Sequence, residues 1–180
     1  MEQSYTYTNL SSVRTSTLVS AYTTSLGTTR VLNLGYSYDD IGNITAITRD
    51  GVDESQYTYD SQGQLRTETI VSQNLKFEYT YDNYGNIKTV TKKNLSTDAV
   101  IETYGYTYGD SQWRDRLTAF AGKAFVYDNI GNPTTYYNGG TDADKYTFTW
   151  QNGRELATEQ KNGVTTTYTY GAGAISIIGK

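Results

Sequence analysis

The stretch Tyr36-Ser37-Tyr38-Asp39-Asp40-Ile41-Gly42-Asn43-Ile44 decides the fold, and Tyr79-Thr80-Tyr81-Asp82-Asn83-Tyr84-Gly85-Asn86-Ile87 repeats it nearly residue for residue. Tyrosine alternates with Ser or Thr, which gives the period-2 pattern of a half-buried strand built from good strand formers. The aspartate can hydrogen-bond the backbone ahead of it, and the glycine three residues later supplies a positive φ for a type I turn that closes into a G1 bulge. Each stretch therefore predicts a strand, a tight turn and a second strand.

The same spacing of two aromatic residues recurs along most of the chain. Its copies are Tyr36/Tyr38, Tyr57/Tyr59, Tyr79/Tyr81, Tyr106/Tyr108, Phe125/Tyr127, Phe148/Trp150 and Tyr168/Tyr170, with Tyr5/Tyr7 as a candidate eighth. A period of about twenty residues is one supersecondary unit, which is too small to fold alone and is stable only when its neighbours stack on it. The chain is therefore expected to be an array of antiparallel β-hairpins.

The composition favours a thin sheet over a thick aliphatic core. Hydrophobic residues make up 36% of the 180 residues, and 19 residues are tyrosines. A tyrosine buries about 150 to 250 Å² while its hydroxyl still reaches water or a partner. A long sheet coated with tyrosine rings can therefore pack and stay soluble.

The second strand of each hairpin has its apolar residues three positions apart, as at Ile44 and Ile47. In a straight strand this interval places them on opposite faces. Either both faces are partly covered or a bulge switches sides. We expect the first apolar residue to pack beneath the tyrosines and the second to serve the other face or a neighbouring strand.

The repeat resembles the tyrosine-aspartate (YD) repeats of the RHS family, whose consensus is close to Tyr-x-Tyr-Asp-x-x-Gly-Asn-(Ile/Leu). The resemblance covers roughly residues 36–170 and includes a run that looks like the last repeats of bacterial members, at Asp115-Arg116-Leu117-Thr118, Tyr127 to Thr134 and Phe148 to Leu156. We expect the copies that depart from this consensus to turn differently. They are the copies with Gly109 or Gly171 in place of Asp, with Gln151 after Trp150, and with Gln64 in place of Asn.

The resemblance implies an all-β chain whose hairpins form one long, twisted or spiralling sheet. In bacterial toxins of the family such a sheet is a β-shell around a C-terminal effector, and in animal relatives it serves adhesion at the cell surface. The family's terminal core carries an Asp-Pro motif, whereas the only proline here is Pro133, inside a repeat. The resemblance therefore implies a structural repeat segment of a bacterial RHS protein that is secreted or lies at the cell surface, without the core, and whose partners are its own repeats and an enclosed effector.

Three regions are expected along the chain. Residues 1–35 are rich in Ser and Thr and look like a degenerate repeat or a capping hairpin. Residues 36–170 hold the repeats, and residues 171–180 form an apolar tail that departs from them. Because an open sheet has unpaired edge strands, we expect edge-to-edge association of copies or a terminal segment that covers the rim.

Charge and hydropathy exclude several classes of partner. The net charge of −4 and the pI of about 4.8 argue against nucleic-acid binding, because proteins that bind nucleic acid present a basic surface to it. No run of eighteen apolar residues exists, so no membrane-spanning helix is expected. The start of the chain lacks the positive and apolar regions of a signal peptide, so any export signal is expected upstream or already removed.

Catalysis is not expected, because the chain has no His and no Cys and so lacks the usual general base, thiol nucleophile and soft metal ligands. Asp39, Asp60, Asp82 and Asp128 recur at one turn position, which indicates a structural role. We expect no cofactor and no metal.

The residues expected to build the repeats are the aromatic, aspartate and glycine positions of its best copies. They are Tyr36, Tyr38, Asp39, Gly42, Tyr57, Tyr59, Asp60, Gly63, Tyr79, Tyr81, Asp82, Gly85, Tyr127, Asp128 and Gly131. The alternative function is a carbohydrate or cell-wall binding module that stacks exposed aromatic rings on polysaccharide, with Trp113 and Trp150 as candidate ligand contacts.

Overall fold

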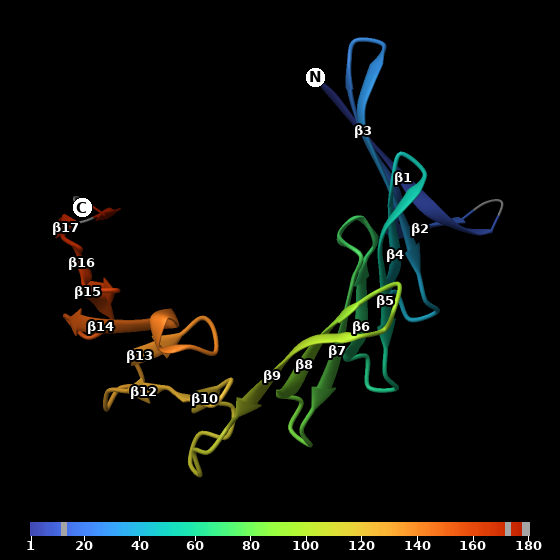
Figure 1. The fold of residues 1–180 in the computed structure, drawn as a ribbon. Coiled ribbons are helices and arrows are strands. Elements are labelled where there is room, and N and C mark those ends of the chain that lie inside the picture. The colour runs from blue at the N-terminus through green and yellow to red at the C-terminus, as the bar shows by residue number, and fades with distance from the viewer. Residues whose placement is uncertain (12–13, 172–173, 178–180) are drawn as a thin grey trace. The chain divides into compact units, whose positions relative to one another are not determined.

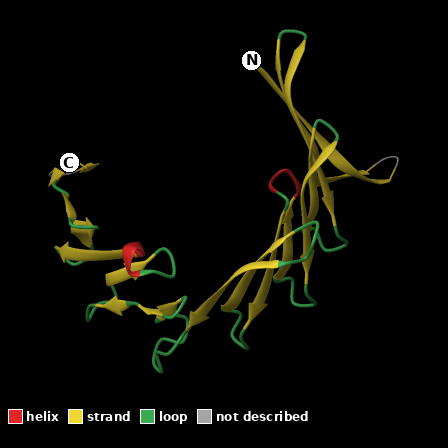
Figure 2. Cartoon of the chain, in the orientation of Figure 1, coloured by secondary structure: helices red, strands yellow, loops and turns green. Residues whose placement is uncertain are grey.

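The computed structural model describes residues 1–11, 14–171 and 174–177, and nearly all of its regular structure is antiparallel β-sheet (Figures 1 and 2). Strands follow one another in chain order in three sheets of eleven, five and two strands. Within those described ranges, the helical elements are single 3₁₀ turns at Val71–Gln73 and Asp142–Asp144. The expected all-β hairpin array is confirmed, although its hydrogen bonding divides it into three sheets.

The bounds of the strands agree with the hairpin pattern. The eleven-stranded sheet consists of β1 (Glu2–Ser11), β2 (Arg14–Leu26), β3 (Thr29–Tyr38), β4 (Ile44–Arg49), β5 (Val52–Tyr59), β6 (Leu65–Ile70), β7 (Leu75–Tyr81), β8 (Ile87–Asn94), β9 (Val100–Thr107), β10 (Ala119–Phe120) and β11 (Lys123–Ala124). The five-stranded sheet consists of β12 (Val126–Tyr127), β13 (Pro133–Tyr137), β14 (Lys145–Gln151), β15 (Glu155–Lys161) and β16 (Val164–Thr167), and the two-stranded sheet of β17 (Tyr170–Gly171) and β18 (Ala174–Ile177).

The chain divides into two compact units. The first contains Met1–Thr80 and Val90–Glu102, and the second contains Tyr81–Thr89 and Thr103–Lys180. Each unit holds several hairpins and is considered by itself below.

A β-bulge in the second strand of the repeat sets which residues share a face. In the β3–β4 pair, Tyr36 lies opposite Ile47 and Tyr38 lies opposite Ile44, with a shift in register between them. Cross-strand partners lie on the same face of a sheet, so both isoleucines lie on the side of the tyrosines. Our expectation that the second apolar residue serves the other face was wrong, because the extra residue of the bulge restores the alternation.

The same bulge recurs in other repeats, where Tyr59 pairs with Leu65 in β5–β6 and Trp150 pairs with Leu156 in β14–β15. The opposite face carries hydroxyl side chains, and Thr149 and Thr158 are hydrogen-bonded there at 2.6 Å. The repeat therefore has one aromatic and apolar face and one hydroxyl face.

The eleven-stranded sheet ends and the five-stranded sheet begins at Phe125, which lies within the second unit. Its backbone N–H donates to the carbonyl of Thr118 at 2.8 Å, whereas the next residue, Val126, pairs with Thr135 of β13. The chain at this point switches from one partner strand to the other, which accounts for the break between β11 and β12.

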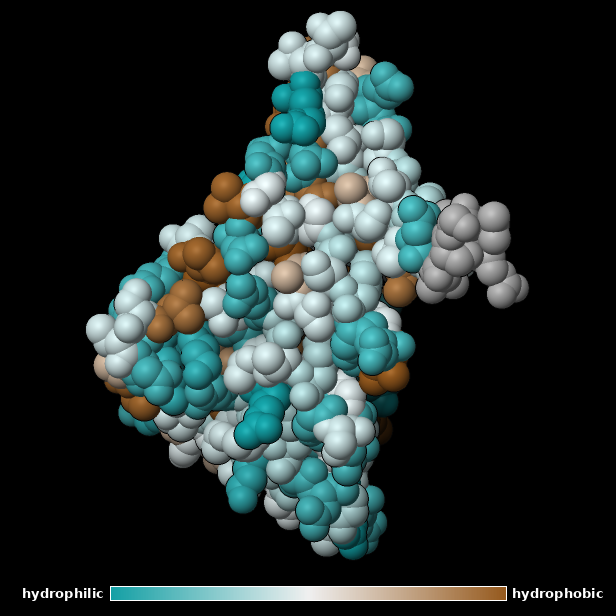
Figure 3. Space-filling model, turned by 90° about the vertical axis from the view of Figure 1, so that its right-hand side faces the viewer, coloured by the Kyte–Doolittle hydropathy of each residue, from teal (hydrophilic) through white to brown (hydrophobic). Residues whose placement is uncertain are grey.

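Few side chains are fully buried, as expected for a thin sheet. Among the described residues, Val90 and Phe125 are the buried hydrophobic side chains, and the tyrosines of the repeat are mostly half-buried. On the face drawn in Figure 3, the hydrophobic patches are small and separate. Within the second unit, ring contacts run from Phe125 to Tyr136, Tyr146, Phe148 and Trp150, with centroids 5.0 to 6.5 Å apart, so aromatic rings supply packing that aliphatic residues usually provide.

The hairpin expected at Asn162-Gly163 is present between β15 and β16. Both residues have positive φ, 50° and 79°, as a type I′ turn requires. The C-terminal tail forms the short β17–β18 pair, in which Tyr170 lies opposite Ile177. None of the helices in the described part of the chain is long and apolar enough to cross a membrane.

Candidate functional site

The aspartate of each regular repeat closes its own turn. In the first copy, Asp39 Oδ1 accepts hydrogen bonds from the backbone N–H groups of Ile41 and Asn43 at 3.1 and 2.8 Å, and its Oδ2 accepts from Asn43 Nδ2 at 2.9 Å. The backbone closes the same turn, because Gly42 N–H donates to the Asp39 carbonyl at 3.1 Å. Asp82 and Asp128 make the corresponding bonds in their turns.

The copy with Gln64 closes in the same way, which corrects our expectation that it turns differently. Asp60 Oδ1 accepts from the backbone N–H groups of Gln62 and Gln64 at 2.8 and 2.9 Å, and Gly63 has a φ of 78°. The backbone bonds need no particular side chain at this position. What Asn adds is the extra bond from its amide to the aspartate.

The turn glycines all need the left-handed region, with φ between 78° and 94° at Gly42, Gly63, Gly85 and Gly131. Gly131 has a second reason. A Cβ on this residue would lie 3.1 Å from the ring of Trp113, because the indole packs against the glycine of the following repeat. The turn of one repeat thus contacts the turn of the next.

Hydrogen bonds shift the acidity of three of these aspartates. Burial alone raises the pKa of Asp39, Asp82 and Asp128, but the bonds from the following Asn and from the turn backbone outweigh it and lower each pKa below the ordinary 3.8. The charged carboxylate is the form that the turn binds.

We expect the free energy of unfolding to fall as the pH drops below about 4. A carboxyl group whose pKa is depressed by folding contributes its stability above its unfolded pKa, and that contribution disappears as the pH falls through the lower folded value. Urea unfolding followed at several pH values between about 5 and 2 measures this dependence. Replacing Asn43, Asn86 and Asn132 together by Ala should flatten it, and a stability that rises on acidification in this range would contradict the role given to the turns.

The second aromatic residue of a repeat donates a hydrogen bond to the repeat before it. Tyr59 Oη donates to the carbonyl of Ile44 at 2.8 Å, and Tyr127 Oη donates to the carbonyl of Leu117 at 2.7 Å. Trp150 Nε1 replaces the phenol and donates to the carbonyl of Pro133 at 2.7 Å. Tyr38 and Tyr170 make the same kind of bond to the carbonyls of Val19 and Leu156, at 2.7 and 3.0 Å.

In four of these bonds the acceptor carbonyl comes from the first apolar residue after the preceding turn. At Ile44, Pro133 and Leu156 this residue lies at the bulge, where the strand ladder is locally disrupted. The ring hydroxyl or indole N–H therefore provides a donor at this point, and links one repeat to the next.

Turns of the second unit are also bonded to each other. Asn132 is only 3% exposed, and its Nδ2 donates both to Asp128 Oδ2 at 2.9 Å and to the carbonyl of Gly153 in the next turn at 2.6 Å. Arg154 Nη2 returns a bond to the carbonyl of Ile130 at 3.1 Å. Asn132 thus serves two turns with one amide group.

The copy with Gly109 turns differently, as expected, because its turn is a longer loop. Asp110 takes the part of the missing aspartate, and its Oδ1 accepts from the backbone N–H groups of Gln112 and Trp113, both at 2.8 Å. Its Oδ2 pairs with Arg116. The guanidinium of Arg116 also lies over the rings of Trp113 and Tyr127, 5.7 and 5.1 Å from their centroids.

The two tryptophans have different surroundings. Trp113 is 51% exposed in the loop, with one part of its ring against Gly131. Trp150 lies half-buried on β14, with its indole N–H bonded to Pro133. The copy with Gln151 also turns differently, since positive φ falls at Asn152 and Gly153 instead of at a single glycine.

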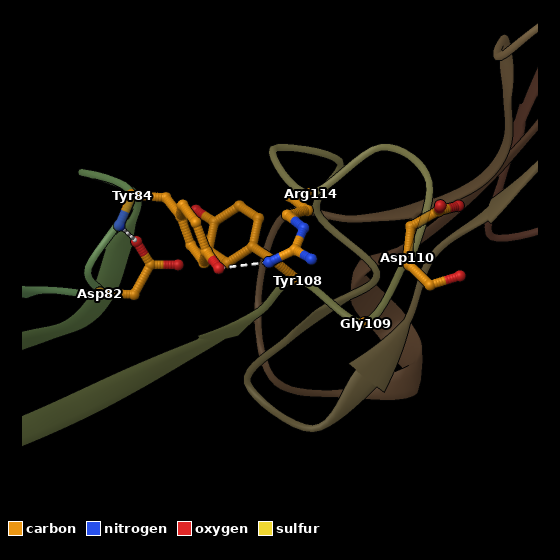
Figure 4. Close-up of a pocket in the computed structure, with 7 residues that line it drawn as sticks. Asp82, Tyr84, Tyr108, Gly109, Asp110 and Arg114 are labelled. Carbon is orange, nitrogen blue, oxygen red and sulfur yellow. Dashed lines mark hydrogen bonds between the residues drawn. The ribbon is translucent and has the colours of Figure 1, made fainter.

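A hollow of about 240 Å³ lies beside the loop (Figure 4). It is lined by Asp82, Tyr84, Tyr108, Gly109, Asp110, Ser111 and Arg114, all within the second unit. Arg114 is hydrogen-bonded to the Tyr84 hydroxyl, and its guanidinium carbon lies 5.1 Å from the centroid of that ring. Sequence reasoning missed Tyr84 and Arg114, because their place in the hollow depends on contact between two turns.

Among the described residues, no group of three His, Cys, Asp or Glu side chains could hold a metal ion. The aspartates at the turns bind their own backbone, as described above.

Solved structures resemble this protein, whereas no protein-family model and no curated protein matches its sequence. The Photorhabdus luminescens Tc holotoxin pore with a TccC3 mutation is 17% identical over 93% of this chain and 11% of that chain, with a TM-score of 0.55. TcdB2-TccC3 without its hypervariable C-terminal region is 17% identical over 93% of this chain and 11% of that one, with a TM-score of 0.56.

The protein spans about a tenth of the length of these chains, so the likeness is one of fold over a short part of each. The fold expected from the YD-repeat motif is confirmed: this protein shares the all-β repeat fold of Tc toxin chains that contain RHS repeat shells.

Proposed function

We propose that this chain is a non-catalytic structural segment of a β-shell scaffold, in a bacterial RHS protein that encloses a toxin or acts at the cell surface. The bond from the second aromatic ring of one repeat to a backbone carbonyl of the repeat before it carries this proposal. A side-chain donor at this position is used for joining repeats and is not offered to a ligand. The aspartates are used in the same internal way, since each accepts several bonds from its own turn.

The fold of the neighbours supports a scaffold role, and a secreted or surface location belongs to the same proposal. The alternative, polysaccharide binding through Trp113 and Trp150, has less support. Trp150 is half-buried and its indole N–H is already bonded to Pro133, so the two rings do not form a pair of exposed platforms.

A graft tests the scaffold role. The chain replaces the segment of TcdB2-TccC3 on which it superposes, and limited proteolysis then measures whether the shell protects what it encloses. We expect protection close to that of the parent. The matched control is the same graft with Tyr59→Ala and Trp150→Ala, which should lose protection because two links between repeats are removed. Equal digestion of both grafts would refute the proposal.

A further inference from the structure

The outer edge of β1 is a row of backbone groups to which no described strand is paired. β1 is an end strand of the eleven-stranded sheet, and its described partner is β2. Folded proteins usually protect such an edge with lysine, proline, a bulge or a very short strand. β1 is ten residues long and holds no Lys, Arg or Pro, and from Glu2 to Asn9 the extra residue at each register shift belongs to β2. This edge is therefore open to another strand.

The sequence of β1 is self-complementary about Thr6. Positions at equal distance from this residue carry side chains of the same kind. The matched pairs are Tyr5 and Tyr7, Ser4 and Thr8, and Gln3 and Asn9. When two copies of a strand pair antiparallel about a two-fold axis at one residue, positions equally distant from that residue lie opposite each other. Each aromatic, hydroxyl and amide side chain in this stretch of β1 would thus meet one of its own kind.

This register also continues the aromatic face of the sheet from one copy to the other. Tyr5 contacts the ring of Tyr22 on β2, with centroids 5.1 Å apart, yet Tyr5 and Tyr7 are still 54% and 46% exposed. Opposite residues of paired strands share a face, so the axis would create two Tyr5–Tyr7 pairs that cover exposed ring surface. A slip of one residue sets the aromatic face of one copy beside the hydroxyl face of the other, and a slip of two leaves a single tyrosine pair.

Charge does not oppose the pairing. Glu2 is the one charged side chain in the sequence of β1. In the register about Thr6 the two Glu2 residues lie at opposite ends of the interface, about 27 Å apart along the strands. This separation exceeds the Debye length of about 8 Å at physiological ionic strength, so their repulsion is screened.

We propose that two copies of this chain dimerise through β1, antiparallel and in register about Thr6. The interface is isologous, so it uses the open edge of each copy and closes without growing into a filament. Of the two expected ways to cover an open rim, the structure favours pairing of copies, since no described terminal strand is hydrogen-bonded to the outer edge of β1. The dimer goes beyond the scaffold role.

Sedimentation of the full chain at concentrations between about 1 µM and 1 mM tests the dimer. We expect the mass to rise with concentration from 20.1 kDa to twice that value. Thr6→Lys and Thr6→Glu should each weaken dimerisation about tenfold or more, because like charges then lie directly opposite at the axis. An equimolar mixture of the two variants should recover the dimer. Ser37→Lys adds the same charge at an exposed position of the inner strand β3 and should leave dimerisation unchanged.

A single cysteine tests the register, since the chain has no Cys of its own. Opposite residues of antiparallel strands have Cα atoms about 4.5 to 5.5 Å apart, which a disulfide can bridge. Thr6→Cys should therefore give a disulfide-linked dimer with oxidised glutathione. Thr8→Cys, on the same face, should not, because its two copies would lie about 13 Å apart.

The cysteine variants decide the question if the charged variants lose their native circular dichroism spectrum. The proposal fails if the chain stays monomeric over the whole range, if folded Thr6→Lys and Thr6→Glu each dimerise as tightly as the unchanged chain, or if Thr8→Cys cross-links as well as Thr6→Cys. Growth into assemblies larger than a dimer would also contradict it. None of these outcomes depends on the graft, so the dimer and the scaffold role can fail independently.

Discussion

Asn132→Ala is expected to lower the free energy of unfolding by about 2 kcal/mol. The side chain is 3% exposed, and its amide donates to Asp128 and to the carbonyl of Gly153. Alanine removes both hydrogen bonds of this buried amide, and each such bond contributes about 1 kcal/mol. Urea unfolding monitored by tyrosine fluorescence and circular dichroism measures the change.

Asn43→Ala is the matched control. Asn43 makes the same bond to the aspartate of its own turn but is half-buried, so its removal should cost about 1 kcal/mol. If the two substitutions cost the same, the bond between neighbouring turns contributes nothing and the second function given to this Asn is wrong.

Trp150→Ala is expected to cost about 3 kcal/mol, at the low end of the range for a buried aromatic because the ring is half-buried. The substitution removes the ring contact with Phe148, the cross-strand contact with Leu156 and the donor to Pro133. Thermal and chemical unfolding measure the loss.

Trp150→Tyr should recover most of that stability, to within about 1 kcal/mol of the unchanged chain. Tyrosine is the residue that makes this bond in the equivalent positions Tyr59 and Tyr127. Trp150→Phe keeps an aromatic ring without a donor and should fall between Tyr and Ala. If the phenylalanine variant is as stable as the tyrosine variant, ring packing alone stabilises this position and the hydrogen bond to Pro133 contributes nothing.

The local parts of the fold could be predicted from the sequence because they depend on residues a few positions apart. Alternating Tyr and Thr indicates a strand, and Asp followed by Gly three residues later indicates the turn. Asp39 and Gly42 illustrate both, since each acts through bonds within five residues. Asn162-Gly163 was equally local, and its φ values agree with the expected turn.

Features that depend on register between strands could not be predicted. The bulge that brings Ile44 and Ile47 to one face is defined by pairing with Tyr38 and Tyr36 across the hairpin. The bonds from Tyr127 to Leu117 and from Asn132 to Gly153 join different repeats, and the distance along the chain varies with the length of the turn between them. A Gly-Asn pair in several turns was the signal that could have indicated the role of the Asn.

The hollow at Tyr84 and Arg114 was beyond sequence reasoning for a related reason. Its residues come from two turns, and the second of these is the irregular loop in which Asp110 takes the place of the usual aspartate.

The central claim is that phenol and indole donors of one repeat are bonded to backbone carbonyls of the repeat before it. Proton NMR of the chain with isotope-labelled tyrosine tests it directly, through the exchange of the hydroxyl protons with water. We predict slowly exchanging hydroxyl protons at Tyr38, Tyr59, Tyr127 and Tyr170, and fast exchange at Tyr108. Hydroxyl protons that all exchange as fast as those of an unfolded chain would contradict the account.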